Sequence, residues 1–163
     1  NRMIVSFYLH NNKILIESSN LADPWTYKEI SIKLMDYPIQ FENLKIEITN
    51  CFKFINEIVS EDKKLNYTKY LPFLFGTSFK DFYTFCKLLN ITYDYVDKYF
   101  TIRIYLNEGN TAFSSYTGED NIYLFTPNEI NYETITSIVL KCFHFHEGKI
   151  TLEELTQYSK TYA

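Results

Sequence analysis

The string Cys142-Phe143-His144-Phe145-His146 holds the residues whose types and spacing best suit chemistry. Cysteine sulfur and histidine nitrogen are good zinc ligands. On a helix, residues four apart share a face, so Cys142 and His146 would meet while His144 points away. On a strand, alternate residues align and all three side chains would converge. Zinc signatures normally contain a second spaced pair of ligands and none follows here, so we expect a structural role for this string, with Cys142 and His146 as the candidates for a metal site.

Catalytic motifs of other kinds do not occur in the sequence. It contains no Gly-rich phosphate loop, no nucleophile elbow around a serine and no paired-histidine metalloprotease motif. We therefore expect a protein that is not an enzyme and that uses no cofactor. The alternative is a small hydrolase or metal-dependent enzyme that uses Cys142 and His146, or a Cys–His pair from distant positions.

The three cysteines, Cys51, Cys86 and Cys142, are far apart in the sequence, and each lies among apolar residues. This pattern is typical of reduced thiols in the core of a cytosolic protein. One disulfide with one free thiol is the alternative.

Residues 104–140 contain no Lys or Arg but five acids, in a chain whose net charge is −4. An acidic surface that carries tyrosines suits a basic protein partner and repels nucleic acid. The residues of this stretch that we predict to bind the partner are Glu108, Glu119, Asp120, Glu129, Glu133, Tyr105, Tyr123 and Tyr132. Local roles are the alternative, because acids are common in turns and because carboxylates in a first helical turn offset the helix dipole.

Composition excludes two other classes of partner. The isoelectric point of about 5.4 and the presence of only two arginines, Arg2 and Arg103, argue against a protein that grips nucleic-acid phosphates. The apolar runs are far shorter than a membrane-spanning segment, so we expect no membrane partner. We expect a cytoplasmic location because the cysteine pattern is typical of reduced thiols. With 163 residues and a hydrophobic fraction of 46%, the chain is expected to form one globular domain, residues 1–163.

The first half of the chain predicts strands followed by helices. Residues 3–9 and 13–18 are apolar and β-branched, and His10-Asn11-Asn12 joins them into a hairpin because Asn tolerates positive φ angles. Alternation over residues 30–34 predicts a third strand. Apolar residues at helical spacing predict a helix over residues 41–61, and Ser78 opens another that runs to Leu89.

The second half predicts a meander followed by helices. Residues 100–106, 111–116 and 121–125 form three strands, which are separated by turns at residues 107–110 and 117–120. The string Thr126-Pro127-Asn128-Glu129 then starts a helix. Gly148 ends that helical region, and Thr151-Leu152-Glu153-Glu154 caps a short last helix.

These elements together predict an α+β fold, in which an antiparallel sheet of the N-terminal hairpin and the 99–126 meander is packed with about four helices. A meander of this order places Glu119 and Asp120 at one end of its sheet. The residues expected together at the other end, where the helix after residue 126 begins, are Glu108, Glu129, Glu133 and Tyr132. An exposed edge of the meander could also add to the sheet of a partner.

A small, acidic, Tyr-rich chain of this kind resembles the immunity proteins of bacterial toxin systems, above all those of contact-dependent growth inhibition. The resemblance spans the whole chain and rests on its size, its acidity and the Asn/Ile/Tyr/Lys-rich usage of stretches such as residues 90–106. It implies a cytosolic inhibitor that binds one cognate toxin domain, often a nuclease. Nucleases are basic where they grip phosphate, so an acidic inhibitor would occlude that surface and associate quickly. A phage or mobile-element accessory protein with a structural role is a further alternative.

Overall fold

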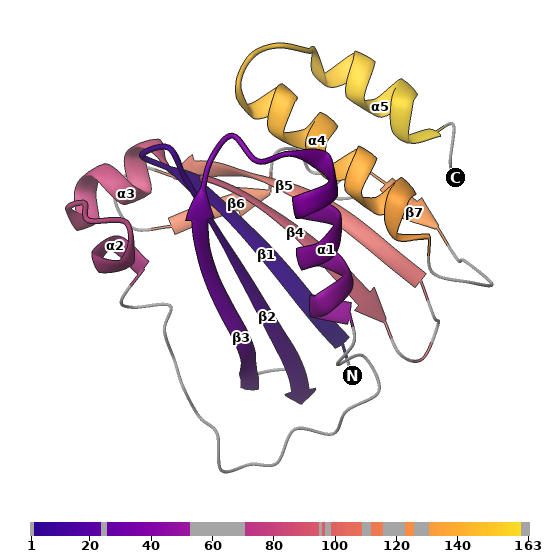
Figure 1. Cartoon of the computed structure of the whole chain (residues 1–163), viewed down its shortest axis with the longest axis horizontal. Helices are drawn as coiled ribbons and strands as arrows, with labels where there is room; N and C mark the ends of the chain where they lie inside the picture. Colours follow the sequence, from indigo (N-terminus) through magenta and orange to yellow (C-terminus); the bar gives the residue numbers. More distant parts are fainter. Residues whose placement is uncertain are drawn as a thin grey trace.

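The structure is a computed structural model that describes residues 2–23, 26–52, 71–94, 96, 99–108, 112–115, 123–125 and 131–160. In these ranges an antiparallel sheet is packed with helices, and the predicted α+β class is confirmed (Figure 1). The strands are β1 (Arg2–His10), β2 (Lys13–Asp23), β3 (Thr26–Asp36), β4 (Lys87–Asp94), β5 (Tyr99–Glu108), β6 (Ala112–Ser115) and β7 (Tyr123–Phe125). The helices are α1 (Phe41–Phe52), α2 (Leu71–Leu74), α3 (Phe79–Phe85), α4 (Tyr132–His146) and α5 (Leu152–Lys160).

The strands form one seven-stranded sheet in the order β3-β2-β1-β4-β5-β6, and β7 also pairs with β5. The predicted N-terminal hairpin is confirmed, with His10 paired to Lys13 across the turn. Asn11 and Asn12 have φ angles of 49° and 56°, the left-handed conformation that a two-residue hairpin turn requires. The predicted third strand is confirmed as β3, which pairs with β2.

The predicted helix from Ser78 to Leu89 is right at its start and wrong at its end. The Ser78 hydroxyl accepts a hydrogen bond from the Asp81 amide at 3.1 Å, so Ser78 caps α3 as expected. The helix ends at Phe85, and Leu89 belongs to β4, which lies between β1 and β5. The apolar spacing of α3 continues by coincidence into β4, whose side chains alternate between the two faces of the sheet. Pairing of β4 with both neighbouring strands makes this segment a strand and not a helix.

The strands of the predicted meander are present, but their pairing differs from the prediction. β6 pairs with β5 through Tyr105–Ser115 and Glu108–Ala112, as expected. β7 does not pair with β6 in the described residues; it pairs with the other end of β5, with Phe125 opposite Phe100. Because β4 occupies the opposite edge of β5, β6 and β7 follow each other in the same direction along one edge.

The C-terminal helices have clear end signals. α4 begins at Tyr132, and the Asn131 side chain caps it by accepting from the Thr134 amide at 3.1 Å. The predicted helix start at Thr126-Pro127-Asn128-Glu129 lies outside the described residues. Gly148, with φ of 74°, ends this helix as predicted. The predicted capping box of α5 is confirmed, because the Thr151 hydroxyl accepts from the Glu154 amide and the Glu154 carboxylate accepts from the Thr151 amide.

The two faces of the sheet are covered differently. α1, α4 and α5 lie over one face, here called the first face, and bury the main core against it (Figure 1). Among the described elements, α2 and α3 lie over the other face, here called the second face, at the end near the β1–β2 turn. Residues 53–61 of the predicted long helix lie outside the described residues, so α1 confirms its first part only.

Candidate functional site

A line of polar side chains crosses the middle of the second face. Ser6 of β1 pairs with Glu17 of β2 on one side and with Asn90 of β4 on the other, and Asn90 pairs with Arg103 of β5. Directly paired residues point to the same face, so these four side chains form one polar row across four neighbouring strands. Strand spacing sets its length at about 14 Å between the Cα atoms of Glu17 and Arg103.

The polar row is buried at one end and half-open at the other. The exposed fractions of Glu17 and Ser6 are 6% and 8%, whereas Asn90 and Arg103 are half-buried. The Ser19 hydroxyl donates to Oε1 of Glu17 at 3.4 Å. Burial is the main reason that the pKa of Tyr8 lies well above its usual value, and the nearby Glu17 carboxylate raises this pKa further. The Glu17 carboxyl group is therefore held inside the sheet face.

One of the two polar groups of the Asn90 side chain has a hydrogen-bond partner among the described residues. Its Nδ2 atom donates to the Tyr105 hydroxyl at 3.3 Å, which links β4 to β5 on the second face. Its Oδ1 atom is buried, and no described residue donates a hydrogen bond to it. A buried amide oxygen without a donor is unfavourable for folding unless a water molecule satisfies it.

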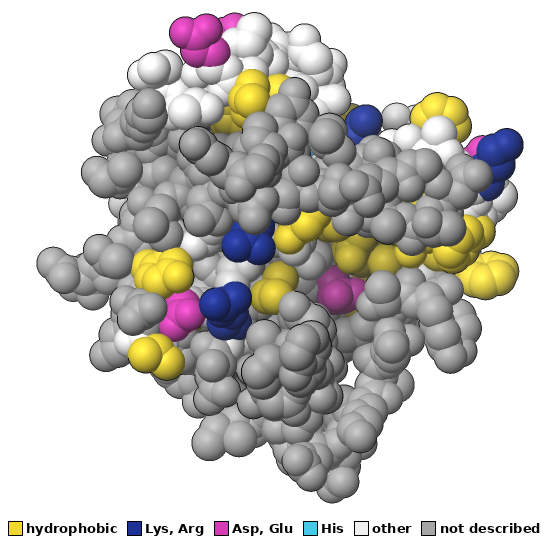
Figure 2. Space-filling model, turned by 180° about the vertical axis from the view of Figure 1, so that it is seen from behind, with side chains coloured by type: hydrophobic (Ala, Val, Ile, Leu, Met, Phe, Trp, Pro, Cys, Tyr) yellow, Lys and Arg dark blue, Asp and Glu magenta, His cyan; other side chains and the backbone are white. Residues whose placement is uncertain are grey.

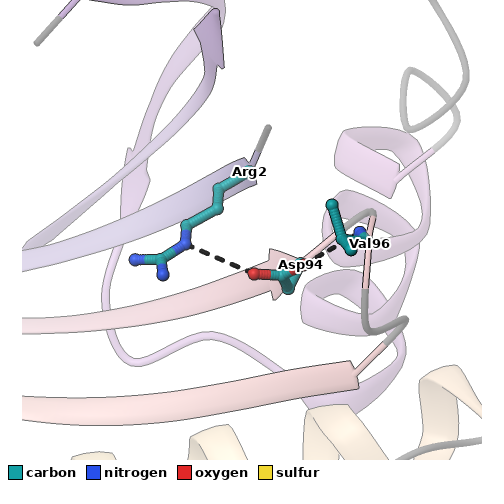
Figure 3. Close-up of polar contacts among 3 residues, drawn as sticks. All are labelled: Arg2, Asp94 and Val96. Atoms are coloured by element: carbon teal, nitrogen blue, oxygen red, sulfur yellow. Dashed lines mark hydrogen bonds and ion pairs between the residues drawn. The ribbon is translucent and has the colours of Figure 1, made fainter. Parts of the chain in front are cut away.

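A second polar contact lies on the same face, where the start of β1 pairs with the end of β4. Arg2 Nε lies 3.5 Å from Oδ2 of Asp94, and Oδ1 of Asp94 accepts from the Val96 amide at 2.8 Å. Figure 3 shows the terminal nitrogens of Arg2 pointing away from the carboxylate. With Arg103, both arginines of the chain thus lie on the second face. Figure 2 views this face and shows basic and acidic side chains near its middle, with apolar side chains gathered to one side.

The predicted partner-binding tyrosines are spread over both faces. Tyr105 is half-buried on the second face, beside the cluster that α2 and α3 form. Tyr132 packs against the main core on the first face. Tyr123 pairs with Ile102, but its side chain lies outside the described residues.

The predicted acidic cluster is not brought together. Glu133 is exposed in the first turn of α4, and the backbone of Glu108 ends β5 opposite Ala112. Tyr132 stacks on Phe52, which itself packs on Phe100 at the start of β5. Glu108 and the Tyr132–Glu133 region are therefore at opposite ends of β5, about 26 Å apart along the strand. The expectation that they share one end is wrong because β7 pairs with the start of β5; the remaining predicted acids, Glu119, Asp120 and Glu129, lie outside the described residues.

The metal-like string lies in α4, so Cys142 and His146 are four residues apart on a helix. Burial raises the pKa of Cys142 to about 12 and lowers that of His146 to about 4. Nε2 of His146 donates to the Leu88 carbonyl oxygen at 3.2 Å, and this hydrogen bond holds the ring against β4. Among the described residues, no three His, Cys, Asp or Glu side chains are grouped as a metal site would need.

The other thiols and His10 are also held in packed surroundings. The three cysteines are buried and free, which confirms the prediction of core thiols and leaves the disulfide alternative without support. Burial raises the pKa values of Cys51 and Cys86. Burial lowers the pKa of His10, whose ring packs edge-to-face on Phe75 and Phe82. These groups favour their neutral forms, which suit packing better than nucleophilic catalysis.

An open groove of about 640 Å³ lies at the outer side of β3, between this strand and α1. Its lining includes apolar side chains and the ion pair between Lys33 and Glu47, which is 2.5 Å long. The groove is lined by Lys33, Met35, Asp36, Pro38, Ile39, Gln40, Asn43, Ile46 and Glu47.

Sequence reasoning missed the polar row. Ser6, Glu17, Asn90 and Arg103 are each ordinary in a strand with one solvated face, and only the pairing of four strands aligns them. The available signal was the alternation in residues 100–106, which already placed Arg103 and Tyr105 on one face.

Comparison with known proteins supports the fold. No protein-family model and no curated protein sequence matches the chain. A protein of unknown function from Neisseria meningitidis is similar in structure, with a TM-score of 0.59 and 10% identity over 87% of this chain and 93% of that one. A chain of the CdiA-CT/CdiI toxin and immunity complex from Yersinia pseudotuberculosis matches with a TM-score of 0.59 and 9% identity, over 93% of this chain and 98% of that one. None of the helices in the described part of the chain has the length and apolar character needed to cross a bilayer.

Proposed function

We propose that this chain is an immunity protein that binds and neutralises a cognate bacterial toxin domain of the contact-dependent growth inhibition type. One observation carries the proposal: nearly the whole chain shares its fold with nearly the whole of a chain from a toxin and immunity complex. The sequence resemblance to this class of inhibitor is independent of that match. Agreement between the two supports function beyond what fold likeness alone would allow.

The chemistry of the chain favours the immunity role over the toxin role. A toxin needs reactive groups in an accessible place, whereas the cysteines here are buried and favour the protonated thiol. His146 is tied to a backbone carbonyl and favours its neutral form. An inhibitor needs a surface only, and the net charge of −4 suits association with a basic nuclease.

The partner surface that we propose is centred on the Tyr105 and Glu108 end of β5. Tyr105 is half-buried on the second face, and Glu108 follows it three residues later at the end of the same strand. A half-buried tyrosine is a typical interface anchor, and an acid at the end of the same strand would add charge to the rim of that surface. Inhibition would be steric and electrostatic, with carboxylates meeting Lys and Arg of the toxin. We propose that this takes place in the cytoplasm, where an internalised nuclease would act.

The test is co-expression with the reading frame next to this gene. The neighbouring product alone should stop growth of a host cell, and the chain should restore growth and co-purify with that product at equal stoichiometry. A neighbour that is harmless, together with failure to capture any basic protein from the native host, would refute the proposal.

A further inference from the structure

β3 forms an edge of the sheet whose outer side is open. The strand pairs with β2 on one side, and no described residue pairs with its other side (Figure 1). The side chains of Ser31, Lys33, Leu34 and Asp36 are exposed, so this part of the strand faces solvent. The edge of a sheet presents N–H and C=O groups that can pair with a further strand.

Apolar side chains flank this edge on both faces of the sheet. Leu34 lies on the second face, opposite Leu15, and is 40% exposed. Ile46 of α1 lies on the first face, lines the groove beside β3 and is 54% exposed. A single exposed apolar residue is ordinary, but these two lie on either side of one open edge. A partner that extends the sheet would cover both of them.

The described charges along the edge are balanced within the chain. Lys33 forms its ion pair with Glu47 of α1, and Lys13 of β2 forms one with Asp36. A strongly basic or acidic partner gains little at such a place, because each charge already has a counterpart. A second copy of this chain presents the same balanced edge, so it can approach there without repulsion despite the net charge of −4.

Twofold symmetry limits the register of such a pairing. Antiparallel copies of one strand that keep the same face of both sheets on one side must have one residue directly opposite itself. The regular part of β3 is residues 31–36, because its pairing with β2 skips Ile30. An axis at Lys33 would place two like charges opposite each other. An axis at Leu34 brings the two Leu34 side chains together and places Lys33 opposite Met35 of the second copy.

We propose that the chain forms a homodimer in which the open edge of β3 pairs antiparallel with β3 of a second copy, about a twofold axis at Leu34. The two sheets become one, and both α1 helices lie on the same side of it. Residues 32–36 of each copy would pair, and an interface this small predicts a Kd of roughly 10–500 µM. β2, β1 and β4 separate this edge from β5, so the dimer leaves the proposed toxin surface free.

The first experiment measures the association of the full chain by sedimentation equilibrium between about 10 µM and 1 mM. Wild type should show a reversible equilibrium between monomer and dimer. Leu34→Lys should raise the Kd by about tenfold or more, because two ammonium groups would be opposite each other at the axis. Val96→Lys is the matched control, since Val96 is 77% exposed and follows the end of β4, away from β3. It should leave the Kd within about twofold.

Two results of this experiment would overturn the proposal. One is a wild-type chain that remains monomeric at about 1 mM. The other is a dimer that Leu34→Lys weakens no more than Val96→Lys does. Thermal unfolding followed by circular dichroism checks that both variants fold, which is expected because both replaced side chains are exposed.

The second experiment tests the register with single cysteine substitutions. Directly opposite residues have Cβ atoms about 5 Å apart, which is close enough for a disulfide, whereas the two copies of Asp36 would be about 13 Å apart along the strands. With glutathione disulfide as the oxidant, Leu34→Cys should form a covalent dimer about tenfold or more faster than Asp36→Cys. The native cysteines are buried and give little background. Equal rates, or a faster reaction of Asp36→Cys, would overturn the axis at Leu34.

The dimer and the immunity role are tested separately. A dimer that Leu34→Lys weakens, with no toxin from the neighbouring gene, would keep the dimer and remove the immunity role. Unchanged toxin binding by Leu34→Lys, together with loss of the dimer, would support two separate surfaces. A monomeric chain whose toxin binding is weakened by Leu34→Lys would assign the edge of β3 to the toxin and overturn the dimer.

Discussion

The ring of Tyr132 stacks on that of Phe52, with centroids 6.1 Å apart and planes inclined by 28°. Phe52 in turn packs edge-to-face on Phe100, at 5.2 Å between centroids. The stack joins the first residue of α4 to the last residue of α1 and to the start of β5. Burial also raises the pKa of the Tyr132 hydroxyl. Tyr132 therefore has a packing role, whatever it contributes to a partner.

Replacing Tyr132 by Ala should lower the free energy of unfolding by about 2–4 kcal/mol, because the stacked ring leaves a cavity beside Phe52. Tyr132→Phe keeps the ring and should cost less than about 1 kcal/mol. Urea unfolding followed by circular dichroism measures both. Equal stabilities for wild type and Tyr132→Ala would show that the stack does not contribute to folding.

Local signals in the sequence predicted the elements that depend on a few neighbouring residues. The two asparagines of the β1–β2 turn, the Ser78 cap and the Thr151 capping box each satisfy backbone groups within four residues, so their effect is visible in one segment. The end of α3 was not predictable in this way. Its apolar spacing reaches Leu89, and only pairing with β1 and β5 fixes that residue in a strand.

Pairing over long distances in the chain explains the other differences. Nothing near Tyr123 tells whether β7 pairs with β6 or with the start of β5, because both are antiparallel arrangements of the same strands. Because β7 pairs with the start of β5, α4 begins far from Glu108, which lies at the other end of β5. The polar row likewise depends on strands that lie far apart in the sequence, from Ser6 to Arg103.

His146 should make the protein less stable in mild acid. Burial lowers its native pKa to about 4 from an ordinary value of 6.5, so the unfolded chain takes up the proton first as the pH falls. The free energy of unfolding should therefore decrease between about pH 6.5 and pH 4, by at most about 1.4 kcal/mol per pH unit, and recover above pH 6.5. Urea midpoints across this pH range measure the slope.

The matched variants for this pH effect are His146→Gln and His144→Gln on the same helix. His146→Gln should flatten the decrease, whereas His144→Gln should retain it. His10, whose pKa is also lowered by burial, contributes with the same sign and accounts for part of any slope that remains. A wild-type slope no steeper than that of His146→Gln would contradict the assignment.

The three thiols should be unreactive in the native protein. Cys51, Cys86 and Cys142 are buried, and burial raises the pKa of each, so the reactive thiolate is both scarce and inaccessible. An Ellman reaction at pH 8 should run about a hundredfold or more slower without urea than with it. All three cysteines should react once the chain is unfolded. Rapid labelling of one thiol in the native protein would reveal an opening of the sheet or of α4.

Charge reversal should distinguish the two ends of β5 as sites of partner association. Glu108 ends β5 on the Tyr105 side, whereas Glu133 lies in the first turn of α4, on the Phe100 side. Glu108→Lys should slow association with the toxin by roughly threefold or more at low salt, and the effect should shrink as salt rises. Glu133→Lys should change the rate by less than about twofold and should lower stability slightly, because it places a cation at a helix N-terminus. Stopped-flow association at two ionic strengths measures both variants, and a larger effect at Glu133 would move the partner to the first face of the sheet.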